Sequence, residues 1–456
     1  MSDAHGYVET HFDTFKTQLI DLLRIPSIST SSEHAQHVVR AAEWLAADLK
    51  RIGLDTVEII PTEGHPIIFA EWMGAGDERP TVLIYGHYDV QPAVLSDGWK
   101  HEPFDPIEED GFIVARGASD DKGQIFAHIK AVEALLASGN KPPVNIKFLI
   151  EGEEEVGSTH LGAFISSHTD KLKADVCVIS DGGMPAPDQP SIEYALRGLV
   201  TMELEVTGPS VDLHSGSYGG SIHNPAQAIA EIIAQLHTPD GRVAVPGFYD
   251  DVLPLSDEER AELKKTGPIE ADWLKATGVP QAWGEPGYAI HERTGARPTL
   301  EINGIAGGYF EPGFKTVLPA KAWAKISCRL VAHQDPNKIG ELVKAYIQQI
   351  TPPTVRSELR VNRGAPAAFV DIRTKEMQAA IKAYEQGWGK KPVFMREGGS
   401  IPVVVDFQEK LNLPVILMGL GLINDGAHSP NEHFMVEMFR KGIHTSIYFC
   451  ETLSKQ

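Results

Sequence analysis

The sequence predicts an α/β protein in which a mixed, largely parallel sheet flanked by helices is interrupted by an inserted α+β domain. Up to about residue 197, apolar runs typical of buried strands alternate with apolar residues at helical spacing. From residue 198, strands with alternating apolar and polar residues replace that pattern, and it returns at about residue 375. We therefore expect a main domain formed by 1–197 and 375–456 and an inserted domain over 198–374.

The first part of the chain is expected to alternate helices with strands. Apolar residues keep helical spacing up to Pro26, and again over about 37–51. Asp120 or Asp121 is suited to begin a further helix, because aspartate often caps a helix N-terminus. Strands are expected at 56–60, 67–72, 81–85, 144–150 and 174–179, of which the last three are apolar enough for the centre of a sheet.

The inserted segment has a different order of elements. A strand with one exposed face is expected at 199–206, followed by strands near 299–302 and 322–330. Asn224 and Asp335 each precede a proline, which is typical of a helix start. These elements predict a sheet covered by helices on one face. The stretch 238–298 is rich in Pro, Gly and acidic residues and shows few periodic segments. In the returning main domain we expect a strand at 414–418 and a closing helix from about residue 431.

Composition restricts the class of protein. The 456 residues include 41 Lys and Arg against 62 Asp and Glu, a formal net charge of −21, which argues against nucleic acid or a membrane as partner. The three cysteines, Cys177, Cys328 and Cys450, are far apart and form no CxxC pair, which indicates a reducing compartment. The first residues lack the features of a signal peptide, and no apolar run is long enough to span a membrane. We expect a cytoplasmic protein.

Histidine and carboxylate side chains gather at the ends of the predicted strands. His87 and Asp89 point to the same side of an extended chain, although such a pair alone is common at a capped strand end. Four carboxylates at 151 and 153–155 follow a buried strand, where they are costly unless a cation or protons neutralise them. Asp120, Asp181 and His428 occupy similar places. Imidazole and carboxylate ligands suit zinc, manganese or cobalt, and two such metals about 3.5–4 Å apart would share a carboxylate and a water.

The motifs GHYDVQP, GASDDKG, EGEEEVGS, SDGG and GAHSPNE, in this order, resemble the di-zinc metallopeptidases that include carnosinases, carboxypeptidase G, aminoacylases and succinyl-diaminopimelate desuccinylase. DLHSGSYGGSIHNP, KTVLPAKAWAKISCRLV and REGGSIPV resemble the carnosinase-like branch, that of the cytosolic non-specific dipeptidases, more narrowly. The resemblance implies hydrolysis of a peptide or amide bond, in dipeptides or short peptides with a free C-terminal carboxylate, by a metal-bridging hydroxide.

The resemblance also implies a role for each matching residue. The implied ligands are His87 and Asp181 for one metal, Glu155 and His428 for the other, and Asp120 as the bridge, with Asp89 orienting His87 and Glu154 as general base. Which of the consecutive glutamates is the base and which is the ligand depends on the alignment. The assignment here aligns Val156-Gly157-Ser158 with a short Gly-Ser turn of the family. The Gly-Gly pair after Asp181 departs from the bulkier residues of many relatives and changes the expected shape of one pocket wall.

Three residues are implied to bind substrate. His214 resembles an oxyanion donor supplied by the neighbouring subunit, Arg329 a clamp for the substrate carboxylate, and Ser400 a further carboxylate contact at a helix N-terminus. Each also has an ordinary explanation, as a turn residue, a strand-edge charge and a helix cap. The resemblance further implies a cis peptide bond between Asp120 and Asp121. It also implies a homodimer formed through the inserted domain, which would act as a lid hinged near 197–198 and 371–374.

Two other functions are compatible with the same ligand set. An N-acyl-amino-acid amidohydrolase would use this site with another pocket, but the long insert and REGGSIPV favour a dipeptidase. A non-catalytic metal-binding or scaffold protein would have no need of a base such as Glu154 beside the ligands.

Overall fold

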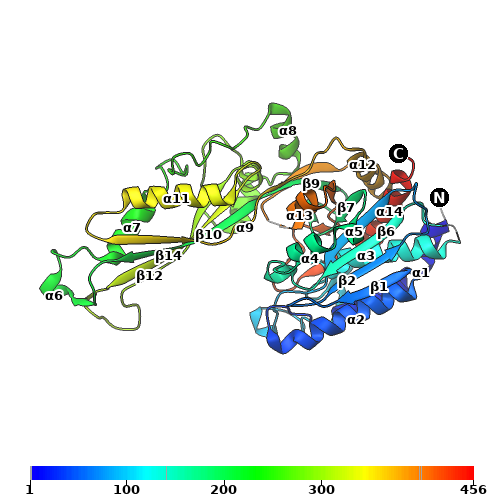
Figure 1. Cartoon of the computed structure of the whole chain (residues 1–456), viewed down its shortest axis with the longest axis horizontal. Helices are drawn as coiled ribbons and strands as arrows, with labels where there is room; N and C mark the ends of the chain where they lie inside the picture. The colour runs from blue at the N-terminus through cyan, green and yellow to red at the C-terminus, as the bar shows by residue number, and fades with distance from the viewer. Residues whose placement is uncertain (1–2, 140, 400, 402) are drawn as a thin grey trace. The chain divides into compact units, whose positions relative to one another are not determined.

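The computed structural model describes residues 3–139, 141–399, 401 and 403–456 (Figure 1). The chain forms two compact units. Unit 1 comprises Met1–Tyr194, Val370–Met395 and Val403–Gln456, and unit 2 comprises Ala195–Phe369 and Arg396–Pro402. The units therefore divide close to the expected positions 198 and 374. The segment 396–402, which we expected in the main domain, groups with unit 2.

The main sheet has the strand order β1-β2-β6-β3-β7-β18-β9, and β16 and β17 also pair with β9. Strands β6, β3, β7 and β18 run parallel to one another, whereas β1, β2 and β9 pair antiparallel with their neighbours. The predicted mixed sheet flanked by helices is confirmed. The strands are β1 Thr56–Ile60, β2 Ile67–Trp72, β3 Thr81–His87, β6 Asn145–Glu151, β7 Val176–Ile179, β9 Ser191–Leu196, β16 Ala368–Phe369, β17 Val393–Glu397 and β18 Val415–Leu417.

The central parallel strands explain why polar side chains meet at one edge. Every residue of β3 and β6 is buried, as their continuous apolar sequences predict. The two strands pair in register from Thr81 with Asn145 to His87 with Glu151. Because parallel strands end at the same edge of a sheet, residues that follow β3, β6 and β7 lie close together there.

Helix α3 is central to the helical layer of unit 1. It is buried from Lys122 to Leu135, polar residues included, and it contacts α1, α14 and strand β3. The closing helix α14 begins at Val436, five residues later than expected, because His433–Met435 form a short strand, β20, that pairs with β5. The helices of unit 1 are α1 Asp3–Leu23, α2 Ala35–Arg51, α3 Lys122–Ala137, α4 Leu161–Ser167, α5 Thr169–Leu172, α12 Lys375–Trp388, α13 Val403–Lys410 and α14 Val436–Leu453. Its shorter strands are β4 Ile107–Glu109, β5 Phe112–Val114, β8 Gly183–Met184, β19 Gly421–Leu422 and β20 His433–Met435.

Unit 2 contains an antiparallel sheet of order β12-β14-β10-β15. Alternate residues of β10 are buried, and α7 and α11 contact the sheet, with α11 lying along it in Figure 1. The side chains of Asn224 and Asp335 cap these two helices by accepting hydrogen bonds from backbone N–H groups, as expected. The strands are β10 Gly198–Thr207, β11 Leu213–His214, β12 Thr299–Gly307, β13 Val317–Leu318, β14 Lys321–Leu330 and β15 Arg356–Val361. The helices are α6 Ser215–Tyr218, α7 Pro225–Ala234, α8 Asp257–Thr266, α9 Glu270–Thr277, α10 Ile290–Gly295 and α11 Pro336–Ile350.

Within the described residues, no helix combines the length and the apolar character needed to cross a bilayer.

Candidate metal centre

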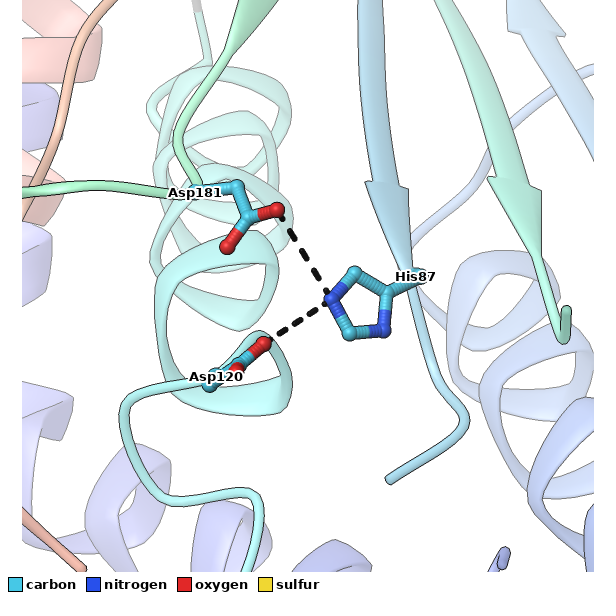
Figure 2. A group of neighbouring side chains, drawn as sticks. All are labelled: His87, Asp120 and Asp181. Carbon is cyan, nitrogen blue, oxygen red and sulfur yellow. Dashed lines mark hydrogen bonds and ion pairs between the residues drawn. The ribbon is translucent and has the colours of Figure 1, made fainter. Parts of the chain in front are cut away.

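The first group of possible metal ligands joins three elements of unit 1. His87 ends β3, Asp120 precedes α3, and Asp181 follows β7. The Nε2 atom of His87 lies 3.1 Å from Asp120 Oδ1 and 3.9 Å from Asp181 Oδ2 (Figure 2). His87 is fully buried, and both carboxylates point toward its ring (Figure 2). One histidine and two carboxylates therefore present their ligand atoms to the same space.

A second group shares Asp120 with the first. The Nε2 atom of His428 lies 3.0 Å from Asp120 Oδ2 and 3.2 Å from Glu155 Oε2. The two oxygens of Asp120 thus face two different histidines, which is the geometry of a bridging carboxylate. In each group the three possible ligand atoms lie within 4.8 Å of one another. The structure therefore brings together the pairs expected from the sequence, His87 with Asp181 and Glu155 with His428, on either side of Asp120.

Asp89 connects His87 to the acidic turn that follows β6. The Nδ1 atom of His87 lies 3.0 Å from the backbone oxygen of Asp89 and 3.4 Å from its Oδ1 atom. The backbone N–H groups of Glu154 and Glu155 donate to the two carboxylate oxygens of Asp89, at 3.2 and 3.1 Å. Asp89 is fully buried; its backbone oxygen holds the ring of His87, and its carboxylate holds the turn and lies close to the same ring.

The acidic run after β6 divides into structural and site-facing members. Glu151 accepts hydrogen bonds from the hydroxyls of Tyr85 and Ser158, at 2.5 and 2.8 Å. Glu153 accepts from the backbone N–H of His65 and lies 2.7 Å from Nδ1 of His160. These two glutamates therefore have their own partners. Glu155 faces the second ligand group, where its Oε2 atom lies 3.2 Å from His428 Nε2 and also accepts a hydrogen bond from Gln91 at 2.7 Å.

Burial raises the pKa of several carboxyl groups at the site, and Glu154 is one of them. Burial raises the pKa of Glu154 well above its ordinary value, and the negative charges of Asp181, Glu155 and Asp120 raise it further, while His87 opposes them. A carboxyl group in such surroundings binds a proton readily.

The titration of the ligand groups indicates that the donor set fits cations. Burial, followed by the charge of Asp120, raises the pKa of Asp181 to about 7. Hydrogen bonds to Asp120 and Glu155 raise the pKa of His428 to about 10. Without a cation the site holds protons in order to balance its carboxylates. A divalent metal in each group would replace those protons, and nitrogen and oxygen donors suit zinc.

The peptide bond between Asp120 and Asp121 is cis, as predicted. Asp121 precedes α3, but its side chain does not cap that helix. Its Oδ2 atom instead accepts a hydrogen bond from the backbone N–H of His87, at 3.1 Å. The two consecutive aspartates therefore make different contacts. Asp120 faces the ligand groups, and Asp121 contacts the end of β3.

The expected substrate-binding residues belong to unit 2. Arg329 on β14 and Arg197 line a cavity of about 440 Å³ within that unit, together with Glu301. His214 is exposed, and its Nδ1 atom accepts a hydrogen bond from the backbone N–H of Gly216, at 3.0 Å, as a turn residue would. Ser400 lies outside the described residues.

One residue near the ligands received no role from sequence reasoning. Glu432 is fully buried and accepts hydrogen bonds from the loop that carries Asp120. It is the last residue of the GAHSPNE motif, and this acidic position so close to a ligand histidine was the signal available in the sequence.

Comparison with known proteins identifies the family. Residues 83–452 match the model of peptidase family M20/M25/M40. The chain belongs to this family. It is 34% identical to the Cys-Gly metallodipeptidase dug1 of Schizosaccharomyces pombe, over 97% of this chain and 96% of that protein. It is 33% identical to the human Beta-Ala-His dipeptidase, over 93% of this chain and 87% of that protein. The solved structure of the M20 family metallo-carboxypeptidase Sso-CP2 from Sulfolobus solfataricus covers 97% of this chain and 99% of its own, with a TM-score of 0.85 and 32% identity.

Membership of the M20/M25/M40 family confirms the predicted class of enzyme. The chain is a metallopeptidase of the dipeptidase type, and its likeness to the carnosinase-like branch is confirmed. The comparisons favour peptide hydrolysis over the deacylase alternative. The convergent His, Asp and Glu side chains form a possible metal-binding site of this peptidase.

Proposed function

We propose that this enzyme uses two divalent metals, zinc in the first instance, to hydrolyse dipeptides and short peptides with a free C-terminal carboxylate. The observation that carries the proposal is the position of Asp120, whose two oxygens lie 3.1 and 3.0 Å from the Nε2 atoms of His87 and His428. A carboxylate shared between two histidine groups is typical of two-metal hydrolases. Asp181 would complete the first ligand set and Glu155 the second.

When bound, the metals would polarise the scissile carbonyl and lower the pKa of a water molecule between them. Glu154 would accept the proton of that water and transfer it to the leaving nitrogen. The position of Glu154 supports this role, because it precedes the proposed ligand Glu155 and its backbone N–H is held by Asp89. Asp89 would orient His87 through its Nδ1 atom and hold the backbone of Glu154.

Arg329 is proposed to bind the C-terminal carboxylate of the substrate. It lines a cavity with Arg197, whose pKa is lowered first by burial and then by the charge of Arg329, so the two guanidinium groups lie near one another. Two neighbouring positive charges favour an anionic ligand, and guanidinium binds carboxylate through paired hydrogen bonds. Ser400 is proposed as a second contact. Closure of unit 2 as a lid, with hinges near 197–198 and 371–374, belongs to the same proposal.

His214 is proposed to contact the developing oxyanion in the site of a partner subunit, within a homodimer formed through unit 2. Large apolar side chains of unit 2 are exposed in the segment of His214 and in the stretch 305–314, as at many protein interfaces. They are Val211, Tyr218, Ile305, Phe310 and Phe314. A position in the cytoplasm is also proposed. It is supported by three buried free cysteines and the net charge of −21, which likewise speaks against nucleic acid as a partner.

A substrate panel tests the proposal. The zinc-loaded protein is assayed with Cys-Gly and β-Ala-His, with the C-terminal amides of both, with a tripeptide, and with an N-acetyl amino acid. We expect turnover of the free dipeptides and at least about tenfold lower kcat/KM for their amides, because a lost contact to a charged group costs about 1.5–3 kcal/mol. Equal turnover of amide and acid forms, or a preference for the N-acetyl amino acid, would contradict it.

A further inference from the structure

Glu432 makes four hydrogen bonds to a single loop, residues 116–120. One carboxylate oxygen accepts from Arg116 Nη1 at 2.7 Å and from the backbone N–H of Gly117 at 2.9 Å. The other accepts from the backbone N–H groups of Ser119 and Asp120, at 2.9 and 3.0 Å. Glu432 is fully buried and Arg116 is 3% exposed, so the carboxylate is shielded from water and tied to this loop alone among the contacts described.

The same segment supplies a ligand to the site. His428 and Glu432 both lie in the stretch 426–432, and both contact Asp120, the first at its side chain and the second at its backbone. The backbone oxygen of Glu432 also accepts a hydrogen bond from the N–H of Ala115, at 3.0 Å. Residue 120 is therefore held from both sides by one short segment. Its carboxylate meets His428 and its backbone N–H meets Glu432.

We propose that Glu432 is a positioning residue that fixes the 116–120 loop so that Asp120 faces both metals, and that it thereby sets the affinity for the metal pair. The inference rests on the proposed two-metal site. These hydrogen bonds fix the backbone of the loop through donors other than the ligand oxygens of Asp120, so Glu432 can hold the bridging carboxylate in position without occupying the site itself.

Only an ionised glutamate satisfies this arrangement. Glutamine has the same shape, but its amide NH₂ would face donors on one side, either Arg116 and Gly117 or Ser119 and Asp120. Aspartate keeps the charge but is one methylene shorter, so it cannot reach all four donors without movement of the chain. Both substitutions should loosen the loop, and glutamine should do so more.

The test compares Glu432→Gln and Glu432→Asp with a matched control, Glu292→Gln in unit 2. Glu292 is also buried, and it also accepts hydrogen bonds from an arginine, Arg260, and a backbone N–H, that of Ala289. Zinc affinity and stoichiometry are measured by competition with a chromophoric chelator. Amide hydrogen exchange of the 116–120 loop is measured in the metal-free proteins.

We expect Glu432→Gln to weaken zinc binding about 10- to 100-fold, the usual effect of losing a partner behind metal ligands. Glu432→Asp should give a smaller loss and Glu292→Gln none. Exchange should accelerate in the 116–120 loop and remain unchanged in the central strands. Wild-type zinc affinity in folded Glu432→Gln would overturn the inference, as would faster exchange throughout unit 1. If the glutamine variant does not fold, wild-type affinity in Glu432→Asp overturns it. Failure of the wild-type protein to bind two zinc ions would instead refute the proposed function.

Discussion

Replacing Glu154 by glutamine should separate metal binding from catalysis. Glu154 lies outside both ligand groups, so the variant should still bind two metals. General acid–base catalysis contributes about 100- to 10,000-fold, so kcat should fall by that factor, equivalent to about 2.7–5.4 kcal/mol in the barrier. Because burial and nearby carboxylates raise the pKa of Glu154, glutamine resembles its protonated form, and the metal-free variant should be at least as stable as the wild type.

The assay uses the three consecutive glutamates as an internal comparison. Glu153→Gln alters a residue whose partners are His160 and the backbone of His65, and it should retain most activity. Glu155→Gln alters a proposed ligand and should lose one metal. Each variant is measured for kcat on a dipeptide, zinc content and metal-free melting temperature. Full activity of Glu154→Gln would refute the base assignment, and two tightly bound metals in Glu155→Gln would show that the ligand register is displaced by one residue.

Three further predictions concern the substrate, the partner subunit and pH. Arg329→Met should lower kcat/KM for dipeptides about 10- to 150-fold, because a hydrogen bond to a charged group is lost. The kcat/KM for C-terminal amides should not change. Equal losses on both kinds of substrate would contradict a carboxylate clamp. Mixing His214→Ala with Glu154→Gln should restore activity in heterodimers, whereas no recovery after confirmed subunit exchange would rule out a shared site. The pKa of Asp181 is raised to about 7. Protonated Asp181 therefore contributes fully to the stability of the folded protein in acid, and this contribution is lost as the pH rises through 7. Asp181→Asn should therefore raise the metal-free melting temperature more at pH 8 than at pH 5, and the opposite trend would contradict this.

The sequence indicates which candidate ligands lie near one another because their positions depend on local features. Buried parallel strands are visible as apolar runs such as 81–85 and 144–150, and the polar residues that follow them meet at one edge of the sheet. The His87 and Asp120 motifs could therefore be placed together before any contact was known. The alternating pattern at 199–206 and the capping residues Asn224 and Asp335 predicted the sheet and helices of unit 2 in the same way.

Features that depend on distant contacts were not predictable. Residues 433–435 have helical neighbours in sequence, but they pair with β5 and delay the start of α14. Helices α8, α9 and α10 lie in the Pro- and Gly-rich stretch that showed few periodic segments. The segment 396–402 groups with unit 2 although it follows the chain of unit 1. The contacts of Glu432 span more than 300 residues of sequence, so its place after His428 marks the residue but does not show which loop it binds.

The central claim is that Asp120 bridges two metals held by His87 with Asp181 and by His428 with Glu155. Anomalous X-ray diffraction from zinc-loaded crystals, collected on both sides of the zinc absorption edge, tests it most directly. We expect two peaks per chain about 3.5–4 Å apart, with one oxygen of Asp120 on each. A single peak, or two peaks of which either lacks Asp120 as a ligand, would contradict it.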